Sequence, residues 1–410
     1  MVDTANKGPD PFFSLPRSAE WNACIGEQGD EENYVDGYIQ AAIELTSAVL
    51  QKRQHGKRDT LVLPILYNAR HGVELALKFA ISELHKMGVI AQSAPRDHDI
   101  SGAYEVLAKA RLGDEMLRSY VDLLAPYIES LSSIDNDGQM LRYSETQRGE
   151  KSMADRSLVN IAVVHASLEE LSGVLFALKE RIADLGQERN TGTYLGDCSR
   201  SDLFEIARML PPRDRWKEPS LDAAKTKVKA RFAIGSAALT EALNTIQAHR
   251  EMGAAIGLSY QLAHITDEHA KLVIKQWLRR HPPRMENGKG HGLEPFSLRE
   301  IVAWDESRRV DRQVNETVRK ALSDEEIADL EVIFYLGRDR QPTEYYESNL
   351  ARVLKKHALN AEPLMAINHL MSKTNFLRCF AKGVERLGRS DLARELTASL
   401  AGGKVSANSE

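Results

Sequence analysis

The chain has 410 residues, 42% hydrophobic and 28% charged, a composition that excludes collagen-like, mucin-like and wholly disordered chains. Aromatic residues make up only 6%, while Ala, Leu and Glu are plentiful, so the composition favours helices over β-sheet. The formal net charge of −5 excludes a chain that is basic throughout, such as a nucleic-acid coat protein.

The N-terminal half is predicted to be an irregular arm at residues 1–32 and then a helical bundle at 33–186. Apolar residues recur at helical spacing from about 34 to 49, from 59 to 86, from 101 to 131 with an interruption at Pro126, and from 153 to 184. A polar loop at 133–152 separates the last two of these segments.

The C-terminal half is predicted to be a second helical domain at residues 201–400, followed by a disordered tail at 401–410. Gly, Asn, Thr and Ser cluster without periodicity at 185–200, which we interpret as the domain boundary. Helix starts are indicated at Thr266 and at two capping boxes, Ser297 with Glu300 and Ser323 with Glu326. No alternating strand pattern of useful length occurs, so the predicted fold class is all-α.

Several classes of site and location are disfavoured by what the sequence lacks. Three widely spaced cysteines argue against a disulfide framework and a zinc site: Cys24, Cys198 and Cys379. Phosphate-loop, dinucleotide-binding, zinc-helix and nucleophile-elbow motifs do not occur. No signal peptide is visible, and no stretch approaches the roughly 18 apolar residues of a membrane span. We therefore expect a cytoplasmic protein that uses no metal or other cofactor and contacts no membrane.

The segment PILYNARHGVELALKFAISEL, residues 64–84, places polar residues in an otherwise apolar helix. Arg70 and Glu74 are four residues apart, as are Glu74 and Lys78, so each pair shares a helix face. One interpretation is a ladder of ion pairs that fixes helix packing. The other is an arginine that holds a phosphate beside His71, a side chain able to exchange protons near neutral pH.

His98 stands at the predicted start of the next helix, where free backbone N–H groups favour anions. Its neighbours include three candidate caps, Asp97, Asp99 and Ser101. His98 is either a capping or packing histidine, or a catalytic residue that faces the arginine and histidine of the preceding helix.

The polar loop contains Arg142 and Tyr143, followed by Arg148 and Lys151. Such a loop is either simply solvated or lies over the phosphate of a nucleotide or nucleic acid. We therefore include Arg142, Tyr143 and Arg148 among the candidate binding residues, with Glu74 and Lys78.

The motifs YNARHGVELALK, HDISGAYEVL and LRYSETQRG occur in this order, and the segment that contains them resembles prokaryotic proteins of the HEPN type. The resemblance covers roughly residues 38–184. It implies an antiparallel helical bundle that often forms a dimer. Many such proteins are metal-independent ribonucleases of toxin–antitoxin or anti-phage systems, and others are inactive scaffolds or nucleotide-binding partners.

The ribonuclease branch carries Arg, then four to six residues, then His, whereas Arg70 and His71 are adjacent. That spacing occurs instead at Arg352 and His357, and at Arg284 and His291. We take Arg352 and His357, which share a predicted helix, as further candidates. Basic runs around residues 225–231, 275–284 and 308–312 are either solvated helix faces or, where they converge, a footprint for RNA or DNA.

Three functions remain open from the sequence. The first is a helical module that binds nucleic acid, a nucleotide or a partner protein in a prokaryotic defence or toxin–antitoxin system. The second is a ribonuclease in which a 2′-hydroxyl attacks the neighbouring phosphate, with Arg70, His71 and His98 as catalytic residues. The third is a structural or regulatory helical protein. The expected partners are RNA or a nucleotide, a second copy of the chain, and a cognate antitoxin or defence protein.

Overall fold

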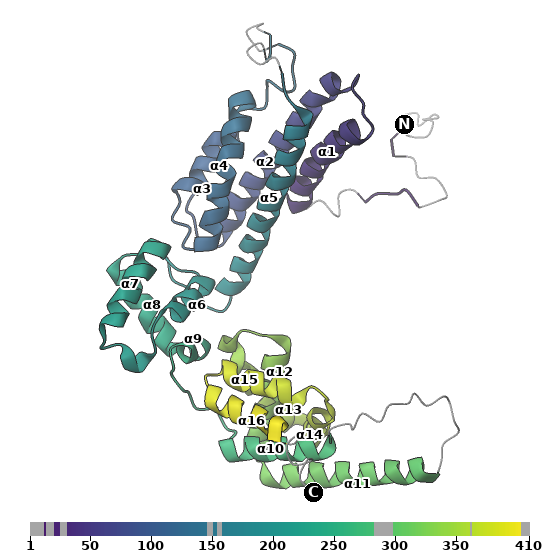
Figure 1. The fold of residues 1–410 in the computed structure, drawn as a ribbon, viewed down its shortest axis with the longest axis vertical. Coiled ribbons are helices and arrows are strands. Elements are labelled where there is room, and N and C mark those ends of the chain that lie inside the picture. The colour runs from purple at the N-terminus through teal and green to yellow at the C-terminus, as the bar shows by residue number, and fades with distance from the viewer. Residues whose placement is uncertain are drawn as a thin grey trace, which may run out of the picture. The chain divides into compact units, whose positions relative to one another are not determined.

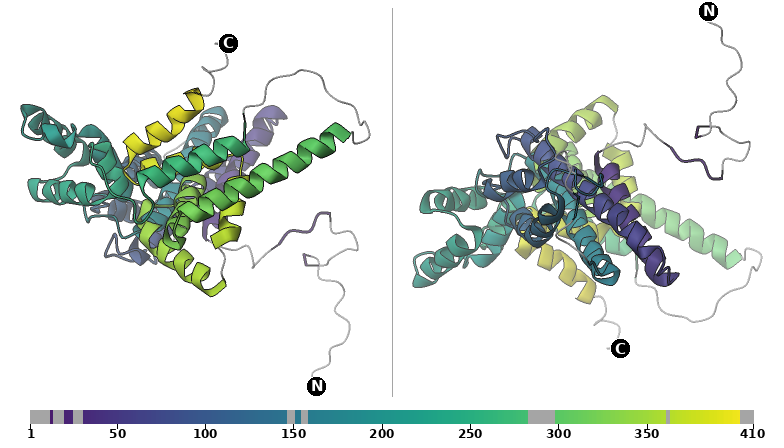
Figure 2. Two further views of the ribbon diagram at one scale, coloured as in Figure 1. Left: turned by 90° about the horizontal axis from the view of Figure 1, so that it is seen from below. Right: turned by 90° about the horizontal axis from the view of Figure 1, so that it is seen from above.

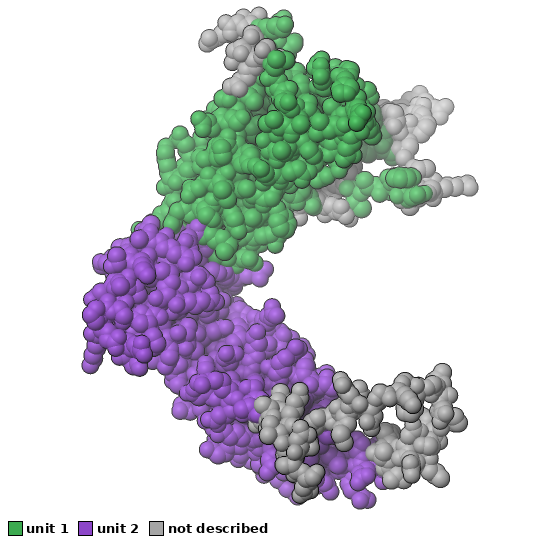
Figure 3. Space-filling view, viewed as in Figure 1, with its two compact units in different colours: residues 1–112, 116–186 green, residues 113–115, 187–410 purple. Residues whose placement is uncertain are grey.

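The computed structural model describes residues 12–13, 20–24, 31–145, 151–153, 158–282, 298–360 and 363–402. Throughout these residues the regular structure is helical, with a single isolated β-bridge between Glu145 and Lys151 (Figures 1 and 2). The predicted all-α fold class is therefore confirmed. The chain divides into two compact units (Figure 3), residues 1–112 with 116–186 (unit 1) and residues 113–115 with 187–410 (unit 2).

Unit 1 is built around α2 (Arg58–Lys86), with α1 (Glu31–Gln51), α3 (Ile100–Lys109), α4 (Glu115–Asp135) and α5 (Ile161–Arg189) packed in one apolar core. A short turn joins α1 to α2, so these two helices run antiparallel and share their apolar faces. The buried face of α2 carries Val73, Leu77 and Ile81, spaced by four residues. α1 begins at Glu31 and so includes the last two residues of the predicted arm.

The helical stretch predicted at 101–131 is interrupted as expected, but the predicted place of the interruption, Pro126, is wrong, because two helices meet at residues 110–114. α3 ends at Lys109 and α4 begins at Glu115, and Gly113 in between has φ +64°, a conformation that glycine adopts readily. Pro126 does not interrupt α4, which continues through it. The residue lies on the exposed side of that helix, where the carbonyl that loses its N–H partner can bond water.

The first part of unit 2 has a small core formed by four helices, with a 3-10 turn between the first two. These are α6 (Arg200–Met209), η1 (Arg213–Arg215), α7 (Pro219–Phe232), α8 (Ser236–Ala248) and α9 (Arg250–Ala255). α5 extends to Arg189, so the irregular stretch between the last helix of the bundle and α6 is 190–199.

The second part of unit 2 has its own core, with α12 (Asp324–Asp339) at its centre. Around it lie α10 (Asp267–Arg280), α11 (Leu298–Ala321), η2 (Thr343–Tyr345), α13 (Tyr346–Asn360), α14 (Pro363–Ser372), α15 (Phe376–Arg386) and α16 (Ser390–Gly402). α10 and α11 lie side by side (Figure 2). Glycines permit close approach of α12 and α15, since a Cβ at Gly337 would overlap the carbonyl oxygen of Cys379.

Two of the three predicted helix starts are confirmed in unit 2. Thr266 accepts a hydrogen bond from the N–H of His269 at 3.2 Å, and Ser323 forms a reciprocal capping box with Glu326. Ser297 lies outside the described residues. α16 extends to residue 402, two residues into the predicted tail.

Candidate functional site

Four polar side chains of unit 1 converge on the carboxylate of Glu74, and we call these four residues and Glu74 the Glu74 cluster. Both predicted pairs form: Arg70 Nη1 lies 2.9 Å from Glu74 Oε2, and Lys78 Nζ lies 2.9 Å from Oε1. His98 joins from the segment before α3, with Nδ1 2.8 Å from Glu74 Oε1. His71 is more distant, with Nδ1 3.7 Å from Oε2.

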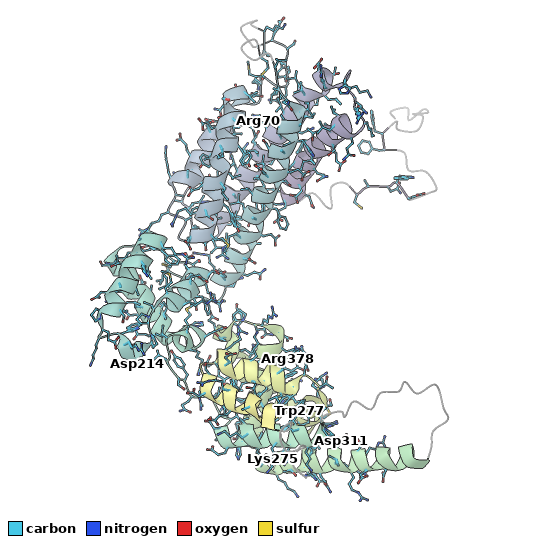
Figure 4. All side chains as sticks on the ribbon, viewed as in Figure 1. Arg70, Asp214, Lys275, Trp277, Asp311 and Arg378 are labelled. Atoms are coloured by element: carbon cyan, nitrogen blue, oxygen red, sulfur yellow. The ribbon has the colours of Figure 1, made fainter. Side chains whose placement is uncertain are left out.

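Arg70 lies inside the bundle, with 1% of the residue exposed (Figure 4). Besides Glu74, its guanidinium donates to three backbone carbonyls. Nε donates to the carbonyl of Asp135 at 2.8 Å, and Nη2 donates to those of Asn136, at 3.0 Å, and of His98. In this arrangement the guanidinium joins α2 to the end of α4 and the start of α3, and a phosphate in solution does not reach it.

Glu74 is buried, and its ionised form is stabilised by its neighbours. Burial alone would raise the pKa of this carboxyl. Hydrogen bonds from four donors outweigh burial and hold the pKa well below its usual range: His71, Lys78, His98 and Arg70. The cluster is therefore a buried carboxylate surrounded by cationic and imidazole groups, and it keeps its negative charge at neutral pH.

His98 directly precedes the N-cap of α3, which is Asp99. Asp99 Oδ1 accepts hydrogen bonds from the N–H of Gly102 and from Asn136 Nδ2, both at 2.8 Å. This cap fixes the backbone of His98 next to α2. The imidazole is hydrogen-bonded to Glu74 on one side, yet 54% of the His98 side chain is exposed. His98 is therefore the most accessible side chain of the Glu74 cluster.

His71 is held between two tyrosine rings. Its ring centroid lies 4.4 Å from that of Tyr38, edge to face, and 5.7 Å from that of Tyr67, stacked. Only 23% of its side chain is exposed. The spacing of Tyr67 and His71 on one helix offered a signal for this contact. Tyr38 belongs to α1, and nothing in the sequence indicated that it packs here.

The loop after α4 is anchored by the same buried groups. The carboxylate of Asp135, 1% exposed, accepts two loop N–H groups at 3.2 and 3.0 Å. Gly138 has φ +78°, and a Cβ there would lie 3.0 Å from Arg70 Nη1. Sequence reasoning missed Asp135 and Asn136, although an Asp–Asn–Asp–Gly run at a helix end is a recognisable turn signal.

This anchored loop presents Arg142 and Tyr143 at the surface. Arg142 Nε donates to the carbonyl of Gly138 at 2.5 Å, and its guanidinium carbon lies 5.7 Å from the centroid of the Tyr143 ring. Both residues are exposed, Tyr143 by 57%. Arg148, the third predicted loop residue, lies outside the described residues.

Arg352 and His357 do not form a pair in α13. His357 is buried, with Nε2 2.9 Å from Glu331 Oε2, whereas Arg352 is exposed and donates to Asn349 Oδ1 at 3.1 Å. Five residues turn a helix by about 140°, so the two side chains leave opposite sides of the helix. Arg284 and His291 lie outside the described residues.

The basic runs of unit 2 are partly neutralised by neighbours. Arg231 Nε lies 2.8 Å from Glu115 Oε1, and Arg280 Nε lies 2.9 Å from Asp311 Oδ1. Arg309 and Arg312 are exposed on α11. These runs therefore offer scattered surface charge, with part of it already paired.

The described residues hold no group of three or more His, Cys, Asp or Glu side chains arranged to bind a metal ion. One helix there, α5, is long and apolar enough to cross a membrane by length and composition alone, contrary to the expectation from the sequence. This is weak evidence for a membrane, because core helices of bundles share that composition and α5 supplies Leu168, Leu171 and Leu178 to the core of unit 1.

Comparison with known proteins finds no match: no family model, no curated protein and no solved structure matches the chain.

Proposed function

We propose that the protein is a non-catalytic helical module that binds single-stranded RNA through the loop after α4, with Arg142 and Tyr143 as the contact residues. The observation that carries this proposal is the division of roles between two arginines. Arg70 is buried and bonded within unit 1, whereas Arg142 is exposed beside an exposed tyrosine ring. The buried cluster anchors the loop, and the loop presents the pair.

The chemistry of that pair suits RNA. An unstacked base stacks on a tyrosine ring or on a guanidinium plane, and an arginine beside the ring also reaches the phosphate backbone. The loop is held by the bonds of Asp135 and Gly138, so little further ordering is needed when a ligand binds. A second copy of the chain and a defence or antitoxin partner, both implied by the HEPN resemblance, belong to the same proposal, as does the cytoplasmic location expected from the sequence.

The test is binding of a fluorescein-labelled 12-nucleotide RNA, measured by anisotropy over a series of salt concentrations. Tyr143→Ala should weaken binding about fivefold or more by removing a stacking surface. Arg142→Ala should weaken it and lower the slope of log K against log salt by about one. A matched control is Tyr194→Ala, because Arg189 also lies over that ring, at 3.9 Å, in unit 2. Absence of RNA binding at low salt, or equal loss in the control, refutes the proposal.

A metal-independent ribonuclease is the second candidate, and a specific observation favours it. The Glu74 carboxylate bonds His98 Nδ1 at 2.8 Å while over half of the imidazole stays exposed, which is how a carboxylate orients a general base. In this reaction the 2′-oxygen attacks phosphorus and the bond to the 5′-oxygen breaks. The base takes the 2′-hydroxyl proton, and an acid protonates the leaving oxygen.

The two candidates are separated by RNA cleavage in EDTA. A nuclease yields products that end in a 2′,3′-cyclic phosphate, and His98→Ala abolishes cutting while RNA binding persists. His71→Ala serves as a comparison, since its ring is packed between tyrosines. Binding without cleavage by the native chain eliminates the nuclease and leaves the binding module.

A further inference from the structure

A groove of about 580 Å³ opens at the end of the bundle where α1 ends and α2 begins, and we call it the turn groove. Aliphatic side chains form its walls: Val49, Leu50, Val62, Leu63, Leu66 and Ile161. Leu50 and Leu63 are 37% and 40% exposed. Exposed apolar residues that line one hollow form a patch of the kind that marks an interaction surface, whereas single exposed leucines need no explanation.

The rim of the turn groove is basic. Arg53, His55 and Arg58 line it, and Lys52 and Lys57 belong to the same exposed turn. Asp59 also lines the rim, and its Oδ1 lies 3.5 Å from Arg58 Nε, so the basic groups there outnumber the one carboxylate. Among residues 51–60 the sequence carries a single acidic residue, Asp59. An occupant that places apolar side chains against the walls therefore meets positive charge at the edge, and carboxylates on the occupant complement it.

Arg53 is held in a conformation that glycine favours. Its φ is +51°, and its N–H donates to the carbonyl of Leu50 at 3.2 Å, while the N–H of Gln54 donates to that of Val49 at 2.9 Å. This is the left-handed position that ends many helices, where glycine is usual and a side chain costs stability. The residue at this position is an arginine, and its side chain lines the groove.

We propose that the turn groove binds an acidic amphipathic helix of a partner protein. Aliphatic residues on one face of that helix fill the groove, and carboxylates beside them pair with Arg53 and Arg58. The described lining contains no Phe, Tyr or Trp ring and consists largely of aliphatic side chains, which suit the apolar face of a helix better than unpaired bases. Arg142 and Tyr143 are not among the lining residues, and the inference does not depend on the proposed function.

The experiment selects peptides from an unbiased random 16-residue library on the immobilised full-length chain. A chain carrying Arg53→Gly and Arg58→Ala serves for counter-selection. The expected result is enrichment of peptides with aliphatic residues at helical spacing and flanking Glu or Asp. Enrichment of basic or aromatic peptides, or no enrichment above the counter-selected chain, overturns the proposal.

The enriched peptide is then labelled and its affinity is measured for single variants. Each of Arg53→Gly and Arg58→Ala should raise Kd about threefold, the effect of losing one exposed ion pair. Leu63→Glu should raise Kd about tenfold or more, because it places a carboxylate against an apolar wall and repels an acidic peptide. Leu123→Glu, on a leucine of α4 that is 53% exposed and does not line the groove, is the matched control and should leave Kd unchanged.

Arg53→Gly distinguishes loss of binding from loss of folding. Because glycine relieves the left-handed conformation, this variant should melt no lower than the native chain and yet bind the peptide more weakly. Unchanged peptide affinity in Arg53→Gly overturns the role of this arginine. Two other occupants are tested with the same variant. If the chain binds vesicles containing phosphatidylglycerol and Leu63→Glu abolishes this binding, the groove belongs to a membrane. If the chain self-associates and Leu63→Glu abolishes the association, the groove belongs to a second copy; either result overturns the peptide proposal.

Discussion

Replacing Glu74 with Gln tests whether the cluster in unit 1 stabilises the fold. The substitution keeps the shape of the side chain and removes its charge. Glu74 Oε2 accepts from Arg70 at 2.9 Å, and Oε1 accepts from Lys78 at 2.9 Å and from His98 at 2.8 Å. A neutral amide supplies one acceptor oxygen in place of two, and it turns an NH₂ group toward one of these donors.

The expected cost is about 3 kcal/mol of the free energy of unfolding of unit 1. The magnitude follows from Arg70, which is 1% exposed and keeps its charge after its anionic partner is gone. The estimate stands at the low end of the range for broken buried ion pairs, because Arg70 retains three backbone carbonyl acceptors.

The sign of the pH dependence follows from the lowered pKa of Glu74. The unfolded chain takes up the proton near the ordinary value of 4.5, while the folded chain resists it. The stabilisation is therefore fully present above about pH 4.5 and is lost as the pH falls further toward the folded pKa. Glu74→Gln lacks this contribution, so the difference in the free energy of unfolding between the native chain and the variant should become smaller as the pH falls below about 4.5.

The assay is urea unfolding with two probes. Far-UV circular dichroism reports on all helices, whereas tryptophan fluorescence reports mainly on unit 2, where Trp216 and Trp277 pack in the two cores. Glu74→Gln should move part of the circular dichroism transition to a lower urea concentration and leave the midpoint of the fluorescence transition unchanged. Glu83→Gln is the control, since it removes an exposed pair with Lys86 on the same helix and should change little. Equal stability of the Glu74 variant and the native chain refutes the reasoning.

Three further outcomes are expected. Burial, with Asp114 nearby, raises the pKa of Asp202 to about 7, so the folded chain keeps a proton that the unfolded chain loses near pH 3.8. The Tm of unit 2, followed by tryptophan fluorescence, should therefore fall as the pH rises from about 4 to 7. Asp202→Asn should abolish that fall. Gly138→Ala should cost about 1–2 kcal/mol by chemical denaturation, because φ is +78° and the added methyl meets Arg70. Gly337→Ala should lower the tryptophan-detected Tm of unit 2 by several degrees, since α12 and α15 must separate; an unchanged Tm contradicts the close packing.

The helices could be predicted from periodicity because burial imposes it locally: Val73, Leu77 and Ile81 mark the buried face of α2 in the sequence and in the structure. The break between α3 and α4 was not predicted, because its cause is a left-handed glycine between two apolar stretches that share one period. The interruption predicted at Pro126 does not occur, since a proline on an exposed helix face costs a hydrogen bond that water replaces.

The composition of the Glu74 cluster could be predicted in part. The four-residue spacing of Arg70, Glu74 and Lys78 dictated their pairing. The partners that decide what Arg70 does are backbone carbonyls at Asp135, Asn136 and His98, and a carbonyl has no sequence signature. The five-residue spacing of Arg352 and His357 does not bring those side chains together. Spacing alone does not say which face of α13 is buried, and only His357 lies on the buried face.

The buried ion pair of Arg70 and Glu74 needs an explanation, because two apolar residues of similar volume would give the core about the same stability. The position of Arg70 supplies it. The last carbonyls of a helix have no partner within it, and α4 ends at Asp135, inside the protein. A buried guanidinium satisfies the carbonyls of Asp135 and Asn136 and complements the negative end of the helix dipole. Glu74 then neutralises the guanidinium, and its remaining oxygen holds His98. The pair thus fixes where the loop begins, and the position of Arg142 at the surface depends on it.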